Sequence, residues 1–259
     1  MKGLFQSFII AFSMYSKIPM PRCEWKEENM AYAMCFWPWV GAVIGLLWYV
    51  WGMIGNHVNM NPAFFTAVLL LISVFVTGGI HLDGLLDTAD AMSSWQTRER
   101  RLEILKDSHA GAFAVITGVV YFVFYYGVCS QLDMRGITAA APGFMLSRTL
   151  SAYAIVTFPK ARKDGTVAAF SRGASTRRVQ AVMIIYGLCL AALMLWLDPL
   201  AGGAALVGAA LVFWYYHHLA MKYFGGTTGD IAGWFLSICE LVMALAVAVV
   251  LIITGGAGA

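Results

Sequence analysis

Three aspartates stand at helical spacing in the stretch T-G-G-I-H-L-D-G-L-L-D-T-A-D-A, residues 77–91. The offsets between Asp83, Asp87 and Asp90 place their carboxylates within about 60° of one another on one helix face. Carboxylates held this close repel one another unless a cation lies between them. Oxygen ligands suit Mg²⁺, which proteins often share with phosphate groups. The spacing therefore predicts a magnesium site, and the alternative is a solvated acidic helix face.

Small residues run beside the acidic face. Gly84, Thr88 and Ala91 form a strip on which we expect a ligand to approach the backbone, and two glycines precede the helix at positions 78–79. This pairing of a small-residue strip with carboxylates favours a ligand site over a solvated face. His81 lies next to the acidic face and is a candidate for acid–base chemistry or metal ligation.

Two further stretches combine glycine with charged or hydroxylic residues just before apolar runs. In K-D-S-H-A-G, residues 106–111, Lys106 and Ser108 would form a phosphate cradle at a helix start, and Asp107 would add a metal ligand. In G-G-T-T-G-D, residues 225–230, Gly229 would let a ligand approach the backbone, and Asp230 would ligate metal. The structural alternative for either stretch is a simple helix N-cap.

Two charged residues fall inside predicted membrane spans, where each requires a partner. Arg148 needs an anion, which would be either a carboxylate on another helix or a substrate phosphate. Glu240 is expected to take part either in a hydrogen bond between helices or in catalysis.

The elements that position these residues follow from composition. The chain has 259 residues, of which 60% are hydrophobic and 12% charged, and its mean hydropathy is +0.73. These values exclude a soluble protein and predict an all-α, polytopic transmembrane helix bundle in one domain over residues 1–259. A net charge of +3 is too small to indicate a nucleic-acid partner. The five cysteines have no C-x-x-C spacing and are expected to be reduced.

About seven spans are expected after an amphipathic or partly inserted N-terminal helix over residues 3–16. Their ranges are 33–55, 62–77, 112–130, 137–157, 179–197, 200–221 and 231–253.

The distribution of Lys and Arg predicts the orientation of the bundle. The loops at 78–111, 158–178 and 222–230 hold most of the basic residues, whereas the turns at 56–61, 131–136 and 198–199 hold one arginine between them. Because basic loops stay in the cytoplasm, we expect a multi-pass protein of the cell (inner) membrane with the acidic stretch on the cytoplasmic face.

The motif G-G-I-H-L-D-G-L-L-D-T-A-D resembles the signature of the cobalamin-5′-phosphate synthase family, the adenosylcobinamide-GDP ribazoletransferases. Other family-like pieces follow in the same order, so that the resemblance spans almost the whole chain: S-K-I-P-M-P at 16–21, R-E-R-R-L-E-I-L-K-D-S-H-A-G at 98–111, Arg148 and T-G-D at 228–230. The chain departs from the family at Ala91 and Ala114, where glycine is usual, and at His109, where arginine is usual.

The resemblance implies a magnesium-dependent transfer. Adenosylcobinamide-GDP and α-ribazole, or its 5′-phosphate, are joined with release of GMP. The roles carried over are catalysis for Asp83, Asp87 and His81; phosphate binding for Lys106, Ser108, Arg148 and Gly229; and metal ligation for Asp83, Asp87, Asp90, Asp107 and Asp230. His81 or a carboxylate would take the proton of the acceptor hydroxyl. Other expected partners are the lipid bilayer and either a second copy of the chain or other enzymes of corrinoid synthesis.

Two rival functions are weaker. A CDP-alcohol phosphotransferase pattern laid from Asp83 demands alanine and arginine where the chain has Asp87 and Thr88. A transporter would place Asp83, Asp87 and Glu240 along a path, but the acidic stretch lies at a span end and no inverted repeat is visible.

Overall fold

The computed structural model describes residues 2–107, 109–162 and 176–255. Helices make up most of this part of the chain, and its one pairing of extended backbone is an isolated bridge between Lys160 and Thr227. The all-α class predicted from the sequence is confirmed.

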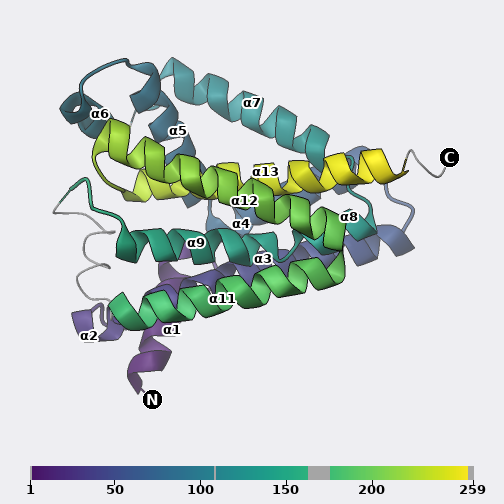
Figure 1. The fold of residues 1–259 in the computed structure, drawn as a ribbon, viewed down its shortest axis with the longest axis horizontal. Coiled ribbons are helices and arrows are strands. Elements are labelled where there is room, and N and C mark those ends of the chain that lie inside the picture. Colours follow the sequence, from purple (N-terminus) through teal and green to yellow (C-terminus); the bar gives the residue numbers. More distant parts are fainter. Residues whose placement is uncertain (1, 108, 163–175, 256–259) are drawn as a thin grey trace.

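The long helices run side by side along the longest axis of the molecule (Figure 1). In chain order the helices are α1 (Lys2–Tyr15), α2 (Glu27–Met30), α3 (Ala33–His57), α4 (Pro62–Thr77), α5 (Ile80–Ser93), α6 (Arg98–Ile104), α7 (Ala112–Cys129), α8 (Met134–Ala140), α9 (Gly143–Thr157), α11 (Thr176–Leu197), α12 (Pro199–Leu219), the π-helical turn η1 (Ala220–Phe224) and α13 (Gly229–Gly255).

Helices occur at each of the predicted spans, but fewer of them qualify as spans on their own. Five helices in the described part are long and apolar enough to cross a membrane, namely α3, α7, α11, α12 continued by η1, and α13. The bent pair of α4 and α5 would add a sixth. The predicted fourth span is interrupted between α8 and α9, because the chain turns at Ala141 and Pro142. Proline cannot donate the backbone hydrogen bond that a continuous helix requires.

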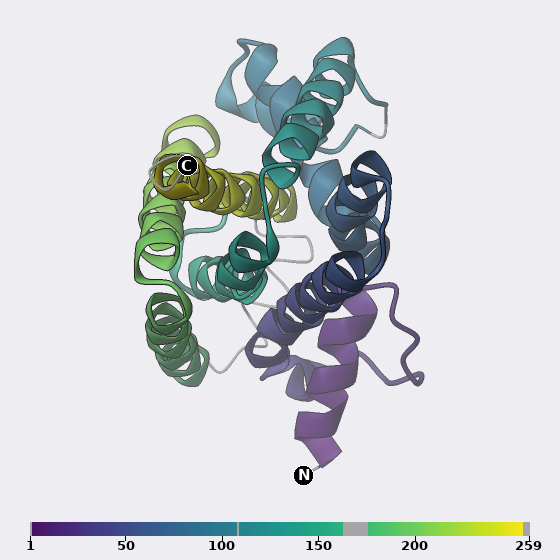
Figure 2. The same cartoon turned by 90° about the vertical axis from the view of Figure 1, so that its right-hand side faces the viewer.

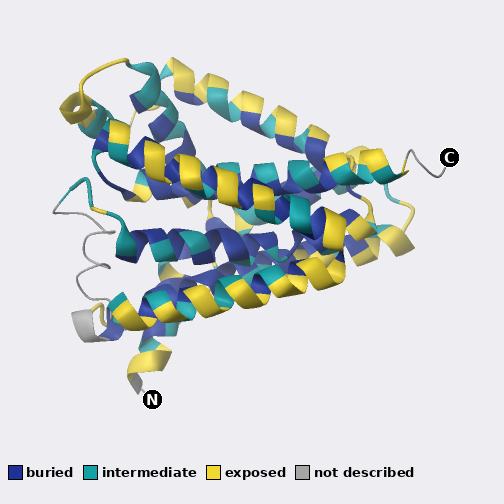
Figure 3. Cartoon of the chain, viewed as in Figure 1, coloured by how far each residue is buried: buried dark blue, intermediate teal, exposed yellow. Residues whose placement is uncertain are grey.

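The outer faces of α7, α11 and α12 are exposed and apolar (Figure 3). Val123 on α7, Leu188 on α11 and Trp214 on α12 are each at least 67% exposed. Exposing such apolar surfaces to water would be unfavourable, whereas the chains of membrane lipids would cover them. The exterior therefore fits a polytopic membrane protein.

The most enclosed helix is α9, which packs against α3, α11 and α13 (Figure 2). Its inward face carries Arg148 and Ser151, both without exposed surface. Polar side chains in such a place must find partners within the bundle.

Two consecutive glycines turn the chain sharply between α4 and α5. Gly78 and Gly79 have φ angles of 66° and 82°, in the left-handed region that side chains disfavour. The axes of α4 and α5 consequently meet at 93°. The lysine of the S-K-I-P-M-P stretch covers this corner, because the Lys17 N–H donates to the Val76 carbonyl at 2.7 Å.

The helix α5 then crosses α13 with the two backbones in contact. A Cβ added at Gly84 would lie 2.5 Å from the Asp230 carbonyl oxygen, and one added at Gly233 would lie 2.9 Å from the His81 carbonyl oxygen. The strip of small residues, which the sequence suggested would face a ligand, is therefore buried: Gly84 meets α13, and Thr88 and Ala91 are at most 1% exposed. Small residues commonly permit this kind of close helix packing in membranes.

The two ends of the bundle carry different charged residues. One end, which we call the carboxylate end, carries α5 with its aspartates, α6 and the turn at residues 225–228. The far end carries α8 and the turn into α12 (Figure 1). At the far end the predicted lone arginine, Arg135, donates through Nε to Asp198 Oδ2 at 2.6 Å. Asp198 also caps α12 by accepting from the N–H of Ala201.

Replacing Gly84 by alanine should destabilise the protein by about 1–3 kcal/mol, because the new methyl group overpacks the crossing. The matched control is Gly127→Ala on α7, where an added Cβ meets nothing within 4 Å and the higher helix propensity of alanine is retained. Thermal unfolding in detergent compares the two. Equal melting temperatures for the two variants would contradict the tight crossing.

Candidate active site

Carboxylates from two helices meet at the carboxylate end. Asp83 and Asp87 lie one turn apart on α5, and the crossing at Gly84 brings in Asp230 from the first turn of α13. Asp83 and Asp230 line one cavity of about 120 Å³. We call Asp83, Asp87 and Asp230 the carboxylate cluster.

The electrostatics of Asp87 reflect this crowding. The helix α5 lies outside the five long spanning helices, and Asp87 is half-buried. Burial raises the pKa of Asp87 from its ordinary value, and neighbouring carboxylates raise it further, to about 7. Those neighbours are Asp83, Asp230 and Asp90, in falling order of effect. The cluster thus holds more negative charge than its surroundings neutralise.

The oxygen ligands of the carboxylate cluster suit a Mg²⁺ ion that is bound partly by protein and partly by substrate phosphates. Among the described residues, no group of three or more His, Cys, Asp or Glu side chains is placed so that it could hold a metal ion by itself. Mg²⁺ does not need such a group, because it usually keeps several waters and binds one or two carboxylates together with substrate phosphates. The oxygen-only cluster matches that pattern, and the magnesium site stays a prediction.

Asp90 has a structural task that the sequence pattern did not reveal. Its Oδ2 accepts from the Gly111 N–H at 2.6 Å, and its Oδ1 accepts from the Ala114 N–H at 2.8 Å. Both oxygens therefore cap the first turn of α7 and fix that helix against α5. Although its charge still acts on Asp87, Asp90 is better described as a helix cap than as a metal ligand.

The described residues of the K-D-S-H-A-G stretch are largely exposed. Asp107 Oδ1 accepts from the His109 N–H at 3.0 Å and lies 2.7 Å from His109 Nδ1. Lys106 is also exposed, and Ser108 lies outside the described residues. No contact in the described part joins Lys106 or Asp107 to the carboxylate cluster, and the phosphate cradle and the metal-ligand role of Asp107 stay predictions.

His81 and Gly229 do lie at the cluster. Both line the cavity that Asp83 and Asp230 share. His81 is 9% exposed, and within the described chain its Nε2 has no hydrogen-bond partner. Gly229 begins α13, and the Thr228 hydroxyl beside it accepts from the Ile231 N–H at 3.2 Å, so that Thr228 caps the helix.

Two arginines of α6, which belong to the family-like piece at 98–111, pack against η1. Arg98 Nε donates to the Phe224 carbonyl at 2.7 Å, and the Arg101 guanidinium lies 5.0 Å from the centre of the Tyr223 ring. Arg101 Nε is buried and has no partner among the described residues.

A third arginine reaches the same place from the segment after α9. Arg162 Nη2 donates to the Leu102 carbonyl on α6, and its charge acts on Asp230. Its Nε is likewise buried without a partner in the described part. Arg162 thus supplies positive charge to the carboxylate cluster, whereas Arg98 and Arg101 pack against η1. The spacing in R-E-R-R was the available signal, but a family-like charged stretch does not reveal which side chains turn inward.

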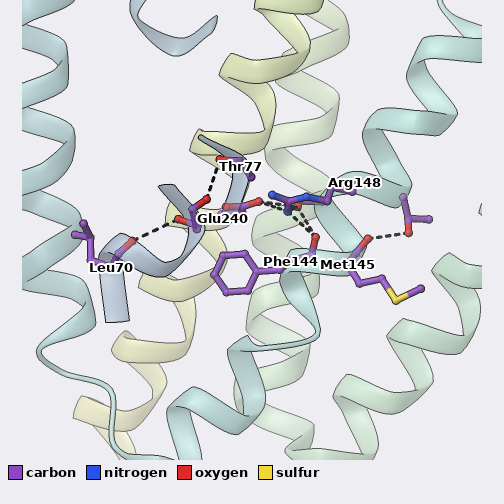
Figure 4. Close-up of polar contacts among 9 residues, drawn as sticks. Leu70, Thr77, Phe144, Met145, Arg148 and Glu240 are labelled. Carbon is purple, nitrogen blue, oxygen red and sulfur yellow. Dashed lines mark hydrogen bonds and ion pairs between the residues drawn. The ribbon is translucent and has the colours of Figure 1, made fainter. Parts of the chain in front are cut away.

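Arg148 finds its anion inside the bundle (Figure 4). Its Nη1 lies 2.5 Å from Glu240 Oε1 and also donates to the Phe144 carbonyl at 2.8 Å. The Ser147 hydroxyl donates to the same Glu240 oxygen at 3.1 Å. Of the two anions expected from the sequence, the carboxylate is the one present. With no exposed surface, Arg148 is not placed to bind a substrate phosphate.

Removing one partner of the Arg148–Glu240 pair should lower the stability of the protein far more than removing both partners together. Arg148→Met or Glu240→Leu alone should lower stability by roughly 3–5 kcal/mol, because one buried charge is left uncompensated, and the double variant should cost much less than the sum. The measurement is a double-mutant cycle on thermal unfolding.

The control for that cycle is the exposed pair of Arg100 and Glu103, whose Nη1 and Oε2 atoms lie 2.6 Å apart. Arg100→Met and Glu103→Leu should each change stability by less than about 1 kcal/mol. Additive effects at Arg148 and Glu240 would refute the coupling.

Comparisons with known proteins place the chain among enzymes of one kind. Residues 7–248 match the sequence model of the family described as cobalamin-5-phosphate synthase. The chain is similar to the adenosylcobinamide-GDP ribazoletransferase of Lachnoclostridium phytofermentans, with 46% identity over 94% of this chain and 93% of the relative. Proteins of the same name from Clostridium botulinum and Desulfitobacterium hafniense are 31% and 32% identical over 93% and 91% of this chain, and 96% and 94% of their own lengths. No solved structure matches the chain.

Proposed function

The chain belongs to the cobalamin-5-phosphate synthase family, and we propose that it is a membrane-embedded transferase that joins adenosylcobinamide-GDP to α-ribazole or its 5′-phosphate. The observation that carries the assignment to this site is the carboxylate cluster, in which Asp83 and Asp87 come from the family signature and Asp230 is acted on by the charge of Arg162. Family membership over 242 matched positions, residues 7–248, leaves the CDP-alcohol phosphotransferase and transporter readings without support.

The reaction is a displacement at phosphorus. A hydroxyl oxygen of the nucleoside forms a new bond to the phosphorus attached to the corrinoid, the bond between that phosphorus and the bridging oxygen breaks, and GMP leaves with the bonding electrons. The hydroxyl proton passes to His81 or to a carboxylate of the cluster, the acceptors nearest the cavity.

In the proposed site one or two of the carboxylates of Asp83, Asp87 and Asp230 would hold Mg²⁺ together with substrate phosphate groups. The bound ion would neutralise phosphate charge and lower the pKa of the attacking hydroxyl. Arg162, whose charge already acts on Asp230, would help to hold the diphosphate. Because phosphate groups complete the magnesium coordination, the incomplete protein ligand set is consistent with this role.

We further propose that the protein lies in the cell (inner) membrane and that the carboxylate end faces the cytoplasm, where GDP-linked substrates are available. The support is the accumulation of basic residues at that end, while Arg135 at the far end is neutralised by Asp198. Association with a second copy or with other corrinoid enzymes stays a prediction.

Purified protein in detergent should release GMP from adenosylcobinamide-GDP only when both α-ribazole and Mg²⁺ are present. Asp83→Asn and Asp87→Asn should each remove this activity, because the cation loses a charged ligand, while the melting temperature stays near that of the unchanged protein. Glu103→Gln is the control, since Glu103 is an exposed carboxylate on α6 at the same end. Full activity of Asp83→Asn and Asp87→Asn in saturating Mg²⁺ would refute the metal assignment.

The raised pKa of Asp87 predicts pH-dependent magnesium binding. Below a pKa of about 7 the carboxyl is protonated and neutral, so a cation must displace its proton. Magnesium affinity should therefore rise by about tenfold between pH 6 and pH 8. Calorimetric titration with Mg²⁺ at the two pH values measures this change.

Asp87→Asn should flatten that dependence, since asparagine does not titrate in this range. Glu103→Gln should leave the dependence as it is. An equally steep rise in the Asp87→Asn protein would mean that another group governs binding.

A further inference from the structure

A cavity with aromatic walls lies directly beneath the carboxylate cluster. Five helices contribute to it: α1, α3, α5, α9 and α13. We call it the aromatic cavity and define it by Tyr15, Trp37, His81, Ile155 and Leu236. Its volume is about 120 Å³, and Asp83 and Asp230 also line it.

The walls are arranged as a stack of rings. Tyr15 and Trp37 lie with their ring centres 4.4 Å apart and their planes 24° from parallel. The His81 ring centre is 6.1 Å from that of Trp37. Tyr15 and Trp37 therefore stack on each other, and the ring surfaces that line the cavity can meet another flat ring, because aromatic groups gain from offset stacking or edge contact beyond the burial of area.

The indole N–H of Trp37 lacks a hydrogen-bond partner in the described part of the chain. The Trp37 side chain is 1% exposed, so that this donor is buried. A buried donor without a partner is costly, and native proteins rarely retain one without a reason. An acceptor nitrogen on a bound molecule would satisfy it.

We propose that the aromatic cavity binds the heteroaromatic base of the nucleoside substrate, with Trp37 Nε1 donating a hydrogen bond to it. This inference rests on the proposed function. A benzimidazole-type base has a flat bicyclic ring and one acceptor nitrogen away from its sugar, which matches a cavity lined by aromatic and aliphatic side chains in which the Trp37 Nε1–H lacks an acceptor. The sugar hydroxyl then extends toward Asp83, where the phosphate is attacked.

Guanine, the other bicyclic base in the reaction, fits the same space less well. It carries several donors and acceptors on its edge, and each one buried against Ile155 and Leu236 would lose its hydrogen bond to water. The corrinoid macrocycle exceeds the volume of the cavity and must lie outside it.

The test uses full-length protein in detergent and two variants of the aromatic cavity. Trp37→Phe keeps a stacking ring and removes the donor, and Leu236→Trp fills the cavity. The control is Trp39→Phe, on the same helix, whose indole is 46% exposed and donates to the Tyr186 hydroxyl at 3.2 Å. Two quantities are measured: the Kd of α-ribazole by calorimetry without Mg²⁺, and the KM of each substrate in the GMP-release assay. Melting temperatures verify folding.

Trp37→Phe should raise the Kd and KM for α-ribazole by about 3- to 10-fold, which is the effect of one neutral hydrogen bond. Leu236→Trp should raise them more than tenfold. The KM for adenosylcobinamide-GDP should change by less than about twofold in both variants, and Trp39→Phe should match the unchanged protein.

A rise in the KM for adenosylcobinamide-GDP with an unchanged Kd for α-ribazole would overturn the proposal, because it would place guanine in the cavity. Unchanged values for both substrates in a folded Leu236→Trp protein would overturn it as well. Absence of GMP release by the unchanged protein would instead refute the proposed function, and this inference with it. The unchanged protein thus distinguishes the two failures.

Discussion

The close crossing of α5 and α13 is the contact on which the site depends. Glycines stand on both sides of it, Gly84 on α5 and Gly233 on α13, and the space that either side chain would need is occupied by the opposite backbone. Because the helices touch, Asp230 comes within reach of carboxylates that are far away in sequence. The same contact places the backbone of His81 against α13 and so sets the wall of the cavity. Packing and electrostatics are therefore coupled here, because the close contact of two helices brings their carboxylates together.

Pairs of opposite charge elsewhere in the bundle make the clustering of carboxylates at the site more informative. Arg148 and Glu240 neutralise each other inside the bundle, and Arg135 and Asp198 do so at the far end. In apolar surroundings an uncompensated charge is costly, so pairing is the ordinary outcome. The carboxylate cluster departs from this pattern, since Asp87 faces other carboxylates. Carboxylates that face one another, in a protein that pairs Arg148 with Glu240 and Arg135 with Asp198, are most simply understood as a site for a cation and an anionic substrate.

Local patterns in the sequence sufficed for the class of fold, the helix positions and the pairing of Asp83 with Asp87, since each depends on composition or on spacing within one helix. They were insufficient wherever a partner comes from a distant segment. Arg148 illustrates the limit: its need for an anion was evident, but only the packing of α9 against α13 selects Glu240. The interruption between α8 and α9 was missed because the residues around Pro142 are apolar enough to resemble a continuous span. The roles of Arg101 and Arg162 depend on how α6 packs against η1, which no spacing rule contains.

The three aspartates of the acidic motif also have different roles, which their spacing in the sequence does not reveal. Asp83 and Asp87 lie toward the start of α5, where α13 crosses, whereas Asp90 lies one turn later, where α7 begins. Helical periodicity makes the three equivalent in angle, but they differ in height along the axis, and height decides which neighbour each one meets. The third aspartate consequently gives its oxygens to the first turn of α7, while its charge still reaches Asp87. One short motif thereby builds the negative site and anchors the next spanning helix beside it. This explains why the acidic stretch is continuous with a span rather than set in a mobile loop.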